Sequence, residues 1–502
     1  MNRELQKKTP YVSALKSYIA ENNTVFDVPG HHQGEIKTDI DKIYSHKIFR
    51  GDVNCPRGLD NIMNPTGVIK EAQELMADAL GAKYSRFLVN GSTVGNLIMV
   101  MTAIKANEKI ILPRNVHKSV INALILSGGV PVFVMPQIDR NTEIVNQPTL
   151  DEWKKAIDLN PDAKAIFVIN PTYFGATTDL KHLAAYAHKK GLLVLADEAH
   201  GSHFYFNKQL PISAMKAGAD MSTLSFHKTG GSLTQSSVLL IGTDRISPYD
   251  VSKAYNMLTT TSPSSILLSS LDAARKFLVF HGKEKLDRAI KISAYATEEI
   301  SQINGFNVRG KEHFLRNGAF DYDLCKVVIE IDKVNLSGFE IYKLLKDKYH
   351  VQIELAETYV LLLIISIGTI QKDIDKLIDA LKEISATYYD ETMVYANRRY
   401  LKSFPILAVR PRSAFHAPLK RVKIEDAENE ISKEMIMVYP PGIPLIVPGE
   451  MFTKEVINQI IYYRSIDTTI LSDYPDGTVS VVDKDNWDLE RQEQVFRDKV
   501  VK

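Results

Sequence analysis

Lys228 and Asp197 are the two residues whose types and spacing suggest chemistry most directly. Lys228 follows the apolar run 221–224 and lies in Ser-Phe-His-Lys-Thr-Gly-Gly, and Asp197 follows the apolar run 192–196. Desolvation and nearby positive charge lower the pKa of a lysine in such a turn, so its amine can attack a carbonyl carbon. A carboxylate placed one helix and one strand away can keep a ring nitrogen protonated. Lys228 and Asp197 together predict a site for a cofactor that carries a carbonyl group and a nitrogen-containing ring.

Ser92, Thr93 and His117 could complete such a site. The two hydroxyl residues follow a glycine and precede a predicted helix at 94–106, where free backbone N–H groups favour a phosphate. His117 follows a predicted strand at 109–112, and its imidazole could stack on a flat ring. The pattern therefore predicts pyridoxal 5'-phosphate (PLP) as the cofactor.

Each of these residues also has a simpler interpretation. Lys228 could be a surface lysine in a turn, and Asp197 could only cap the next helix. Serine and threonine are common before helices, and a loop histidine such as His117 is often merely exposed. The combination is therefore more specific than any single residue.

An alternation of helices and strands must position these side chains. Short apolar runs rich in β-branched residues alternate with amphipathic segments, which predicts an α/β fold with a mostly parallel sheet covered by helices on both faces. In such sheets, ligands bind beyond the carboxyl ends of the strands. The predicted strands are 86–89, 109–112, 131–135, 165–169, 192–196 and 221–224, and the predicted helices are 68–80, 94–106 and 180–190.

Four segments are predicted along the chain. Residues 1–29 form an N-terminal arm, 30–290 the large cofactor-binding domain, 291–394 a smaller α+β domain and 395–502 a C-terminal domain. The smaller domain contains a predicted helix at 284–302, a strand at 326–330 and a helix at 336–348. The C-terminal domain contains Tyr-Pro-Pro-Gly-Ile-Pro at 439–444, which predicts a rigid turn.

Composition favours a small-molecule partner. The 502 residues include 61 Lys and Arg against 60 Asp and Glu, so the net charge of +1 gives no reason to expect binding to nucleic acid or membranes. The only two cysteines, Cys55 and Cys325, lack a disulfide or zinc pattern, so we expect free thiols, no metal and a cytoplasmic location. The charged N-terminus does not resemble a signal peptide, and the apolar run at 359–367 is too short to span a bilayer.

Five strings together resemble the ornithine/lysine/arginine decarboxylases of PLP fold type I, and most closely their compact bacterial branch. The resemblance covers nearly the whole chain. The strings are Ile-Asn-Pro-Thr-Tyr-Phe-Gly at 169–175, Asp-Glu-Ala-His-Gly at 197–201, Ser-Phe-His-Lys at 225–228, Thr-Thr-Thr-Ser-Pro at 259–263 and Tyr-Pro-Pro-Gly-Ile-Pro at 439–444.

The resemblance implies a role for each matching residue. Lys228 would form the Schiff base, Asp197 would pair with the pyridine nitrogen, and His117 would stack on the ring. The remaining cofactor contacts would come from Ser92, Thr93, Ser225 and His227 at the phosphate and from Ala199 and His200 beside the ring. Thr261 and Ser262 would reach the phosphate of a neighbouring subunit, which implies a homodimer, or a higher even-numbered oligomer, with active sites at the dimer interface.

The implied reaction is decarboxylation of a basic amino acid. Lys228 or His227 would return a proton to Cα, and we expect Glu450, with His31, to contact the substrate. Glu450 could equally be a solvated loop acid. Arginine is the first expectation, giving agmatine for polyamine synthesis, followed by lysine, which would give cadaverine, and then ornithine.

The sequence departs from the family pattern at two places. Residues 54–63 contain Asp60 but lack one further acidic residue and a histidine that relatives often have, and Pro29-Gly30-His31 is followed by His32 in place of lysine. These departures concern the substrate more than the cofactor. A regulatory homologue without turnover therefore stays open as an alternative. An aminotransferase or a carbon–carbon lyase also stays open, because such enzymes share the Asp and the Lys on the same fold.

Overall fold

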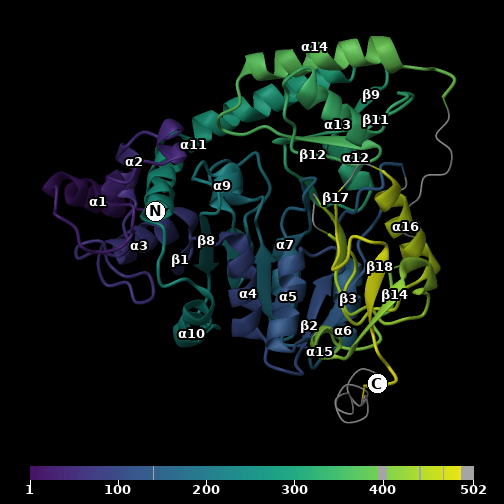
Figure 1. Cartoon of the computed structure of the whole chain (residues 1–502), viewed down its shortest axis with the longest axis horizontal. Coiled ribbons are helices and arrows are strands. Elements are labelled where there is room, and N and C mark those ends of the chain that lie inside the picture. Colours follow the sequence, from purple (N-terminus) through teal and green to yellow (C-terminus); the bar gives the residue numbers. More distant parts are fainter. Residues whose placement is uncertain (140, 394–403, 440–442, 467–468, 488–502) are drawn as a thin grey trace. The chain divides into compact units, whose positions relative to one another are not determined.

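The computed structural model describes residues 1–139, 141–393, 404–439, 443–466 and 469–487 (Figure 1). The chain divides into two compact units, and each unit is built from two separate stretches of sequence. Unit 1 comprises Met1–Thr102 and Val194–Asp287, and unit 2 comprises Ala103–Leu193 and Arg288–Lys502. In the described part of the chain, no helix is both long and apolar enough to cross a membrane.

The strands of unit 1 follow the order β1-β8-β7-β6. β8 pairs antiparallel with both β1 and β7, whereas β7 pairs parallel with β6. Every residue of β7 and β8 is buried, as expected for strands that are covered on both faces. The strand bounds are β1 (Tyr84–Leu88), β6 (Leu193–Asp197), β7 (Met221–Leu224) and β8 (Ser237–Ile241).

The helices of unit 1 include α3 (Val68–Leu80), which coincides with the helix predicted at 68–80. Its buried residues recur at helical spacing, and it ends at Gly81, whose positive φ of 67° favours glycine. The other helices that the structure describes in this unit are α1 (Pro10–Glu21), α2 (Lys47–Gly51), α4 (Gly91–Ala103), α8 (Ala214–Ala217), α9 (Phe226–Thr229), α10 (Pro248–Leu258) and the first part of α11 (Ser265–Ile300).

Unit 2 contains parallel strands in the order β4-β2-β3. All five residues of β2 are buried. The strands are β2 (Lys109–Pro113), β3 (Val130–Val134) and β4 (Ala165–Ile169), and the helices between or after them are α5 (Lys118–Ser127), α6 (Leu150–Leu159) and α7 (Leu180–Lys189). The predicted α/β class is therefore confirmed, and most predicted strands lie within one or two residues of the observed ones.

A four-stranded antiparallel sheet in unit 2 has the order β12-β13-β11-β9. Its strands are β9 (Phe306–Arg309), β11 (Lys326–Ile331), β12 (Leu355–Ala356) and β13 (Val360–Ile364). The short helix α12 (Lys311–Arg316) and the helices α13 (Gly338–Asp347) and α14 (Gln371–Tyr388) accompany it. β5 (Ala176–Thr177) pairs separately with β10 (Asp321–Tyr322).

The C-terminal part of unit 2 has two small sheets around a core of Ile424, Ile436, Phe452, Val456 and Val479. β14 (Leu419–Lys423) pairs with β18 (Thr478–Val482), and β15 (Ile436–Tyr439) lies between β16 (Pro444–Ile446) and β17 (Thr469–Leu471). The two helices are α15 (Pro411–His416) and α16 (Lys454–Ser465). The predicted proline-rich turn falls between β15 and β16, but residues 440–442 lie outside the described residues.

Two predicted helix starts were wrong. α4 begins at Gly91 rather than at residue 94, because Gly91 takes a positive φ of 71° and lets the chain turn into the helix at once. α11 begins at Ser265, well before residue 284, and its long polar and apolar stretches give no clear boundary signal. The domain boundary predicted at residue 290 falls inside this helix.

Candidate active site

Polar residues collect at one edge of the sheet in unit 1. Asp197 ends β6, where it lies opposite Thr223 of the parallel strand β7, and Ser225 directly follows that strand. β1 runs in the same direction as β7, because both are antiparallel to β8. The carboxyl ends of β1, β6 and β7 therefore share one edge, as expected for a ligand site in a sheet of this kind.

Lys228 lies in the short helix α9, directly beyond β7. Its backbone N–H donates to the carbonyl of Ser225 at 3.0 Å, and the neighbouring Phe226 is fully buried and fixes the turn. The Nζ atom of Lys228 lies 2.9 Å from Nε2 of His200. Lys228 is only partly buried, so its amine is well placed to react with a carbonyl group.

Asp197 is buried, with 5% of its surface exposed, and both of its carboxylate oxygens accept hydrogen bonds. Nδ2 of Asn96 donates to Oδ2 at 2.8 Å, and the backbone N–H of Ala199 donates to Oδ1 at 2.9 Å. A carboxylate can accept about four hydrogen bonds in all. Asp197 is therefore held in place, and its carboxylate can still accept a further hydrogen bond from a protonated ring nitrogen.

Ser92 and Ser225 bring two hydroxyl groups together at the start of α4. Their Oγ atoms lie 2.7 Å apart, and Ser92 occupies the first turn of this 13-residue helix. Thr93, which follows, is exposed. Hydroxyl groups beside the free N–H groups of a helix N-terminus form a suitable site for a phosphate.

His227 is held by the backbone and is neutral near pH 7. Its Nδ1 lies 2.9 Å from the carbonyl oxygen of Ser236, which can only accept, so Nδ1 carries the proton. Burial lowers the pKa of His227, and the charge of Lys228 lowers it further, although the bond to Ser236 opposes both effects. A neutral imidazole can accept a proton at its second ring nitrogen.

Gly95 and Glu198 support this arrangement. A Cβ atom at Gly95 would lie 2.0 Å from Oγ1 of Thr223, so only glycine lets α4 approach β7 closely enough for Asn96 to reach Asp197. Glu198 is fully buried and accepts hydrogen bonds from Ser222, from the backbone of Ala214 and from the hydroxyl of Tyr205. These bonds tie the end of β6 to β7 and to the following turns.

Asn96, Ser222 and Glu198 were not predicted from the sequence. Asn96 does leave one signal: it is a polar side chain within the apolar run of α4 and is 1% exposed. A buried amide needs partners, which marks it as a positioning residue.

Three predicted residues lie elsewhere in unit 1. Nε2 of His31 lies 3.3 Å from Oδ2 of Asp52, and its ring packs edge-on against Phe49. Thr261 and Ser262 are both exposed, and Oγ of Ser262 accepts a hydrogen bond from Nδ2 of Asn54 at 3.3 Å.

The unusual segment at 54–63 is structurally ordered by Asp60. Its carboxylate accepts backbone N–H bonds from Asn61, Thr66, Gly67 and Ile69. Burial alone would raise the pKa of Asp60, but these bonds lower it. The segment thus has an acid, and that acid holds the turn before α3.

In unit 2, His117 caps α5. Its Nδ1 accepts the backbone N–H of Ser119 at 3.2 Å and lies 2.8 Å from Oγ of the same residue. The imidazole is only partly buried.

The prediction that Glu450 contacts the substrate needs correction. Arg114 donates to both of its carboxylate oxygens at 2.7 Å, and neither side chain is exposed to solvent. The backbone N–H of Val447 donates to the same carboxylate at 2.9 Å. Because its charge is already neutralised by Arg114, Glu450 holds the C-terminal segment in place and offers no free carboxylate to a substrate cation.

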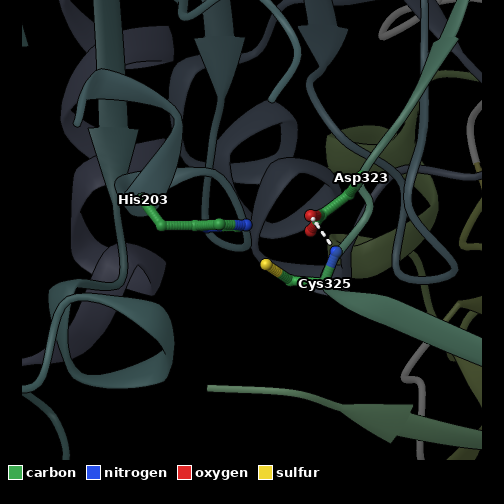
Figure 2. Close-up of side chains that lie close together, drawn as sticks. All are labelled: His203, Asp323 and Cys325. Carbon is green, nitrogen blue, oxygen red and sulfur yellow. Dashed lines mark hydrogen bonds between the residues drawn. The ribbon is translucent and has the colours of Figure 1, made fainter. Parts of the chain in front are cut away.

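His203, Asp323 and Cys325 are residue types that can bind metals (Figure 2). His203 belongs to unit 1, and the other two belong to unit 2. Oδ1 of Asp323 accepts the backbone N–H of Cys325 at 3.0 Å. Burial and the charge of Asp323 raise the pKa of the Cys325 thiol well above its usual range, and a protonated thiol is a poor metal ligand.

The sequence matches two related family models. One is described as Orn/Lys/Arg decarboxylase, major domain, and matches residues 9–373. The other is described as Orn/Lys/Arg decarboxylase, C-terminal domain, and matches residues 395–481.

Curated relatives and solved structures agree with this match. Arginine decarboxylase of Bacillus subtilis is 38% identical over 480 residues, covering 95% of this chain and 98% of the relative. Arginine decarboxylase of Halalkalibacterium halodurans is 39% identical over 460 residues, covering 89% of this chain and 92% of the relative. Lysine decarboxylase A from Pseudomonas aeruginosa superposes with a TM-score of 0.82 at 19% identity, covering 94% of this chain and 80% of the solved one. At 19% identity, the superposition on lysine decarboxylase A shows a shared fold and nothing more.

Proposed function

Because the chain belongs to the Orn/Lys/Arg decarboxylase family, we propose that it removes the α-carboxylate of a basic amino acid as CO₂. Arginine is the proposed substrate and agmatine the product, which would supply polyamine synthesis. Arginine is supported by the relatives from Bacillus subtilis and Halalkalibacterium halodurans, which are named arginine decarboxylases and are 38% and 39% identical to this chain. Lysine ranks second and ornithine third.

The proposed cofactor is PLP, and the residues at the edge of the unit 1 sheet fit it. The amine of Lys228 would bind the cofactor covalently, Ser92 and Ser225 would hold its phosphate, and Asp197 would keep its ring nitrogen protonated. Thr93, Ala199 and His200 would complete its surroundings, together with His117 on the ring face. PLP supplies an electron sink for the pair that remains on Cα when the carboxylate leaves.

The residues of the chain have separate tasks in this mechanism. Asp197 would stabilise positive charge at the ring nitrogen, and Asn96 donates the hydrogen bond that orients that carboxylate. Lys228 as its ammonium, or His227 after it has taken up a proton, would return a proton to Cα. The observation that carries the proposal is the placing of Lys228 with His200, and of Asp197 with Asn96, at the same sheet edge.

The covalent link and the reaction can be tested separately. Borohydride reduction of the purified protein, followed by peptide mass spectrometry, should place the cofactor's mass on Lys228. The variant Lys228→Ala should lose both this label and CO₂ release, whereas the exposed Lys253→Ala should keep both. A label on another lysine would overturn the site.

CO₂ and amine release should then be measured with arginine, lysine and ornithine in parallel. Labelled protein that releases no CO₂ from any of them would favour the aminotransferase, lyase or regulatory alternatives.

We also propose a homodimer, or a multiple of one, in which Thr261 and Ser262 contact the phosphate of the neighbouring subunit. Their exposure supports this role, since an exposed hydroxyl pair is available to a second chain. Sedimentation velocity should show a dimer or a larger even-numbered assembly, and a fully active monomer would contradict the proposal. A cytoplasmic location is proposed as well, and the two free thiols are consistent with it.

A further inference from the structure

Unit 1 contains a cleft of about 390 Å³ that the proposed reaction does not use. One wall is a face of α3, whose lining residues 70, 73, 74 and 77 recur at helical spacing. The other walls come from β1, the end of β8 and the start of α10. Figure 1 shows α9, which carries Lys228, and α10 at opposite ends of β8. The cleft is therefore separate from the candidate active site.

Arg86 lines this cleft and has no carboxylate partner among the residues that the structure describes. Its Nη2 donates to Oγ of Ser252 at 3.1 Å, and its guanidinium carbon lies 5.7 Å from the centre of the Tyr255 ring. Ser252 and Tyr255 are neighbours on the surface of α10, so they hold one side of the guanidinium group. An arginine has five N–H donors, and Ser252 uses one of them. The others are available to an anion in the cleft.

Gln73 supplies a second unused donor in the cleft wall. The residue is 4% exposed, and its Oε1 accepts the backbone N–H of Phe87 at 2.9 Å. Because a backbone N–H can only donate, this bond fixes which end of the amide is the oxygen. Nε2 makes no hydrogen bond with any residue that the structure describes. A buried amide N–H without a partner is costly, so Gln73 indicates an oxygen acceptor in the cleft.

Positive charge predominates among the described lining residues. The cations are Lys70, Lys83 and Arg86, and the acid is Glu74. Nζ of Lys70 lies 3.9 Å from Oε1 of Glu74, and both side chains are exposed. Lys83 forms an exposed ion pair with Asp244, which lies outside the lining. Exposed pairs of this kind contribute little, so both ammonium groups can turn to an anion.

These donors favour one class of ligand, an organic phosphate. A guanidinium group binds phosphate oxygens in pairs, and a phosphate monoester offers three strong acceptor oxygens to Arg86, Gln73 and Lys70, whereas a carboxylate has two. The volume of the cleft falls within the roughly 300–1,000 Å³ of small-molecule sites, which leaves room for an organic group. That group would lie against the uncharged residues Pro65, Ala77, Tyr84, Ile241, Pro248 and Val251.

We propose that this cleft binds a small organic phosphate monoester, with its phosphate on Arg86, Gln73 and Lys70 and its organic group against Tyr84. The site lies wholly in unit 1 and is distinct from the pair of serines at the start of α4 that is proposed for the cofactor's phosphate. Its ligand would be bound in addition to the cofactor and the amino acid substrate.

Isothermal titration with phenyl phosphate tests the proposal. The purified protein is first loaded with PLP and dialysed, so that the proposed cofactor site is filled and the cleft is empty. We expect one phenyl phosphate to bind per chain. Phenol, which lacks the phosphate, and benzoate, which has two acceptor oxygens and a single charge, should each bind at least tenfold more weakly. Equally strong binding of phenol or of benzoate would overturn the proposal.

Matched variants locate the site. Arg86→Met keeps an apolar stem but removes the charge, and it should weaken binding of phenyl phosphate about 10- to 100-fold. Gln73→Glu keeps an acceptor for the backbone N–H of Phe87 but places a negative oxygen where Nε2 was, so it should weaken binding at least tenfold. Arg316→Met, at an exposed arginine of α12 in unit 2, should leave binding unchanged.

A further variant separates the cleft from the proposed cofactor site. Ser225→Ala should bind phenyl phosphate as tightly as the unchanged protein. Binding that is lost in Ser225→Ala, or that is unchanged in both Arg86→Met and Gln73→Glu, would overturn the proposal. A protein that retains no PLP would contradict the proposed function instead, and the Arg86 and Gln73 variants would still report on the cleft.

Discussion

The buried ion pair between Arg114 and Glu450 predicts a large and strongly non-additive effect of mutation. Both N–H···O distances are 2.7 Å, neither residue is exposed, and Arg114 also donates to the carbonyl of Pro444 at 3.0 Å. Two unit charges about 4 Å apart attract by about 4 kcal/mol at an effective dielectric constant of 20. Removing one partner also leaves the other charged in a site without water.

Each single variant, Arg114→Met or Glu450→Leu, should therefore lower the free energy of unfolding by about 3–5 kcal/mol. Independent effects would add to about 6–10 kcal/mol in the double variant. We expect the double variant to lose no more than the worse single variant, because it leaves no unpaired charge and only the hydrogen bonds to Pro444, Leu445 and Val447 are missing.

Urea titration followed by circular dichroism, at equal protein concentrations, measures these four stabilities. Additive losses in the double variant would refute the reasoning. The same variants test whether Glu450 has a structural role rather than a role in substrate binding. A carboxylate that meets the substrate would show a raised KM with little loss of stability, whereas we expect the opposite from Glu450→Leu.

Three further outcomes are expected. Asn96→Leu should lower kcat by about 10- to 100-fold with a smaller change in KM, since the buried Asp197 loses a hydrogen bond worth about 1–3 kcal/mol, and Asn256→Ala on an exposed face should leave both unchanged. Gly338→Ala should cost about 1–3 kcal/mol of stability, because the new Cβ would lie 2.0 Å from the carbonyl oxygen of Glu357, whereas Gly368→Ala, with its nearest atom at 3.6 Å, should stay within about 0.5 kcal/mol. The pKa of Glu357 is higher in the folded than in the unfolded chain, so the folded state binds the extra proton between about pH 5 and 8. As the pH rises through this range, the free energy of unfolding relative to that of Glu357→Gln should fall by about 1.4 kcal/mol per pH unit, measured by urea titration.

The sequence predicted the sheet strands well because their signal is local. β4 and β7 coincide with the strands predicted at 165–169 and 221–224. β4 consists of continuous apolar residues, as expected for a fully buried strand, whereas β7 also contains Ser222 and Thr223. The polar residues that follow β6 and β7 could be predicted for the same reason. Their placing at one edge follows from the parallel pairing of these strands.

The partners of buried polar groups could not be predicted in this way. Glu450 was expected to contact the substrate because nothing near residue 450 indicates Arg114, which lies more than 300 residues earlier in the chain. Asn96 and Gly95 were missed because their roles depend on how closely α4 approaches β7. The cleft beside Arg86 likewise joins segments that are far apart in the sequence.

The pairing of β1 with β8 bears on how the protein is synthesised. β1 ends at Leu88, but its partner begins only at Ser237, so a ribosome working at about 5–20 residues per second needs about 7–30 s to deliver it. Throughout that interval the nascent strand exposes unpaired backbone groups to its neighbours. A chain that stops before β8 should therefore be a substrate for chaperones and prone to aggregate, and slowing translation within 89–236 should lower the yield of active enzyme.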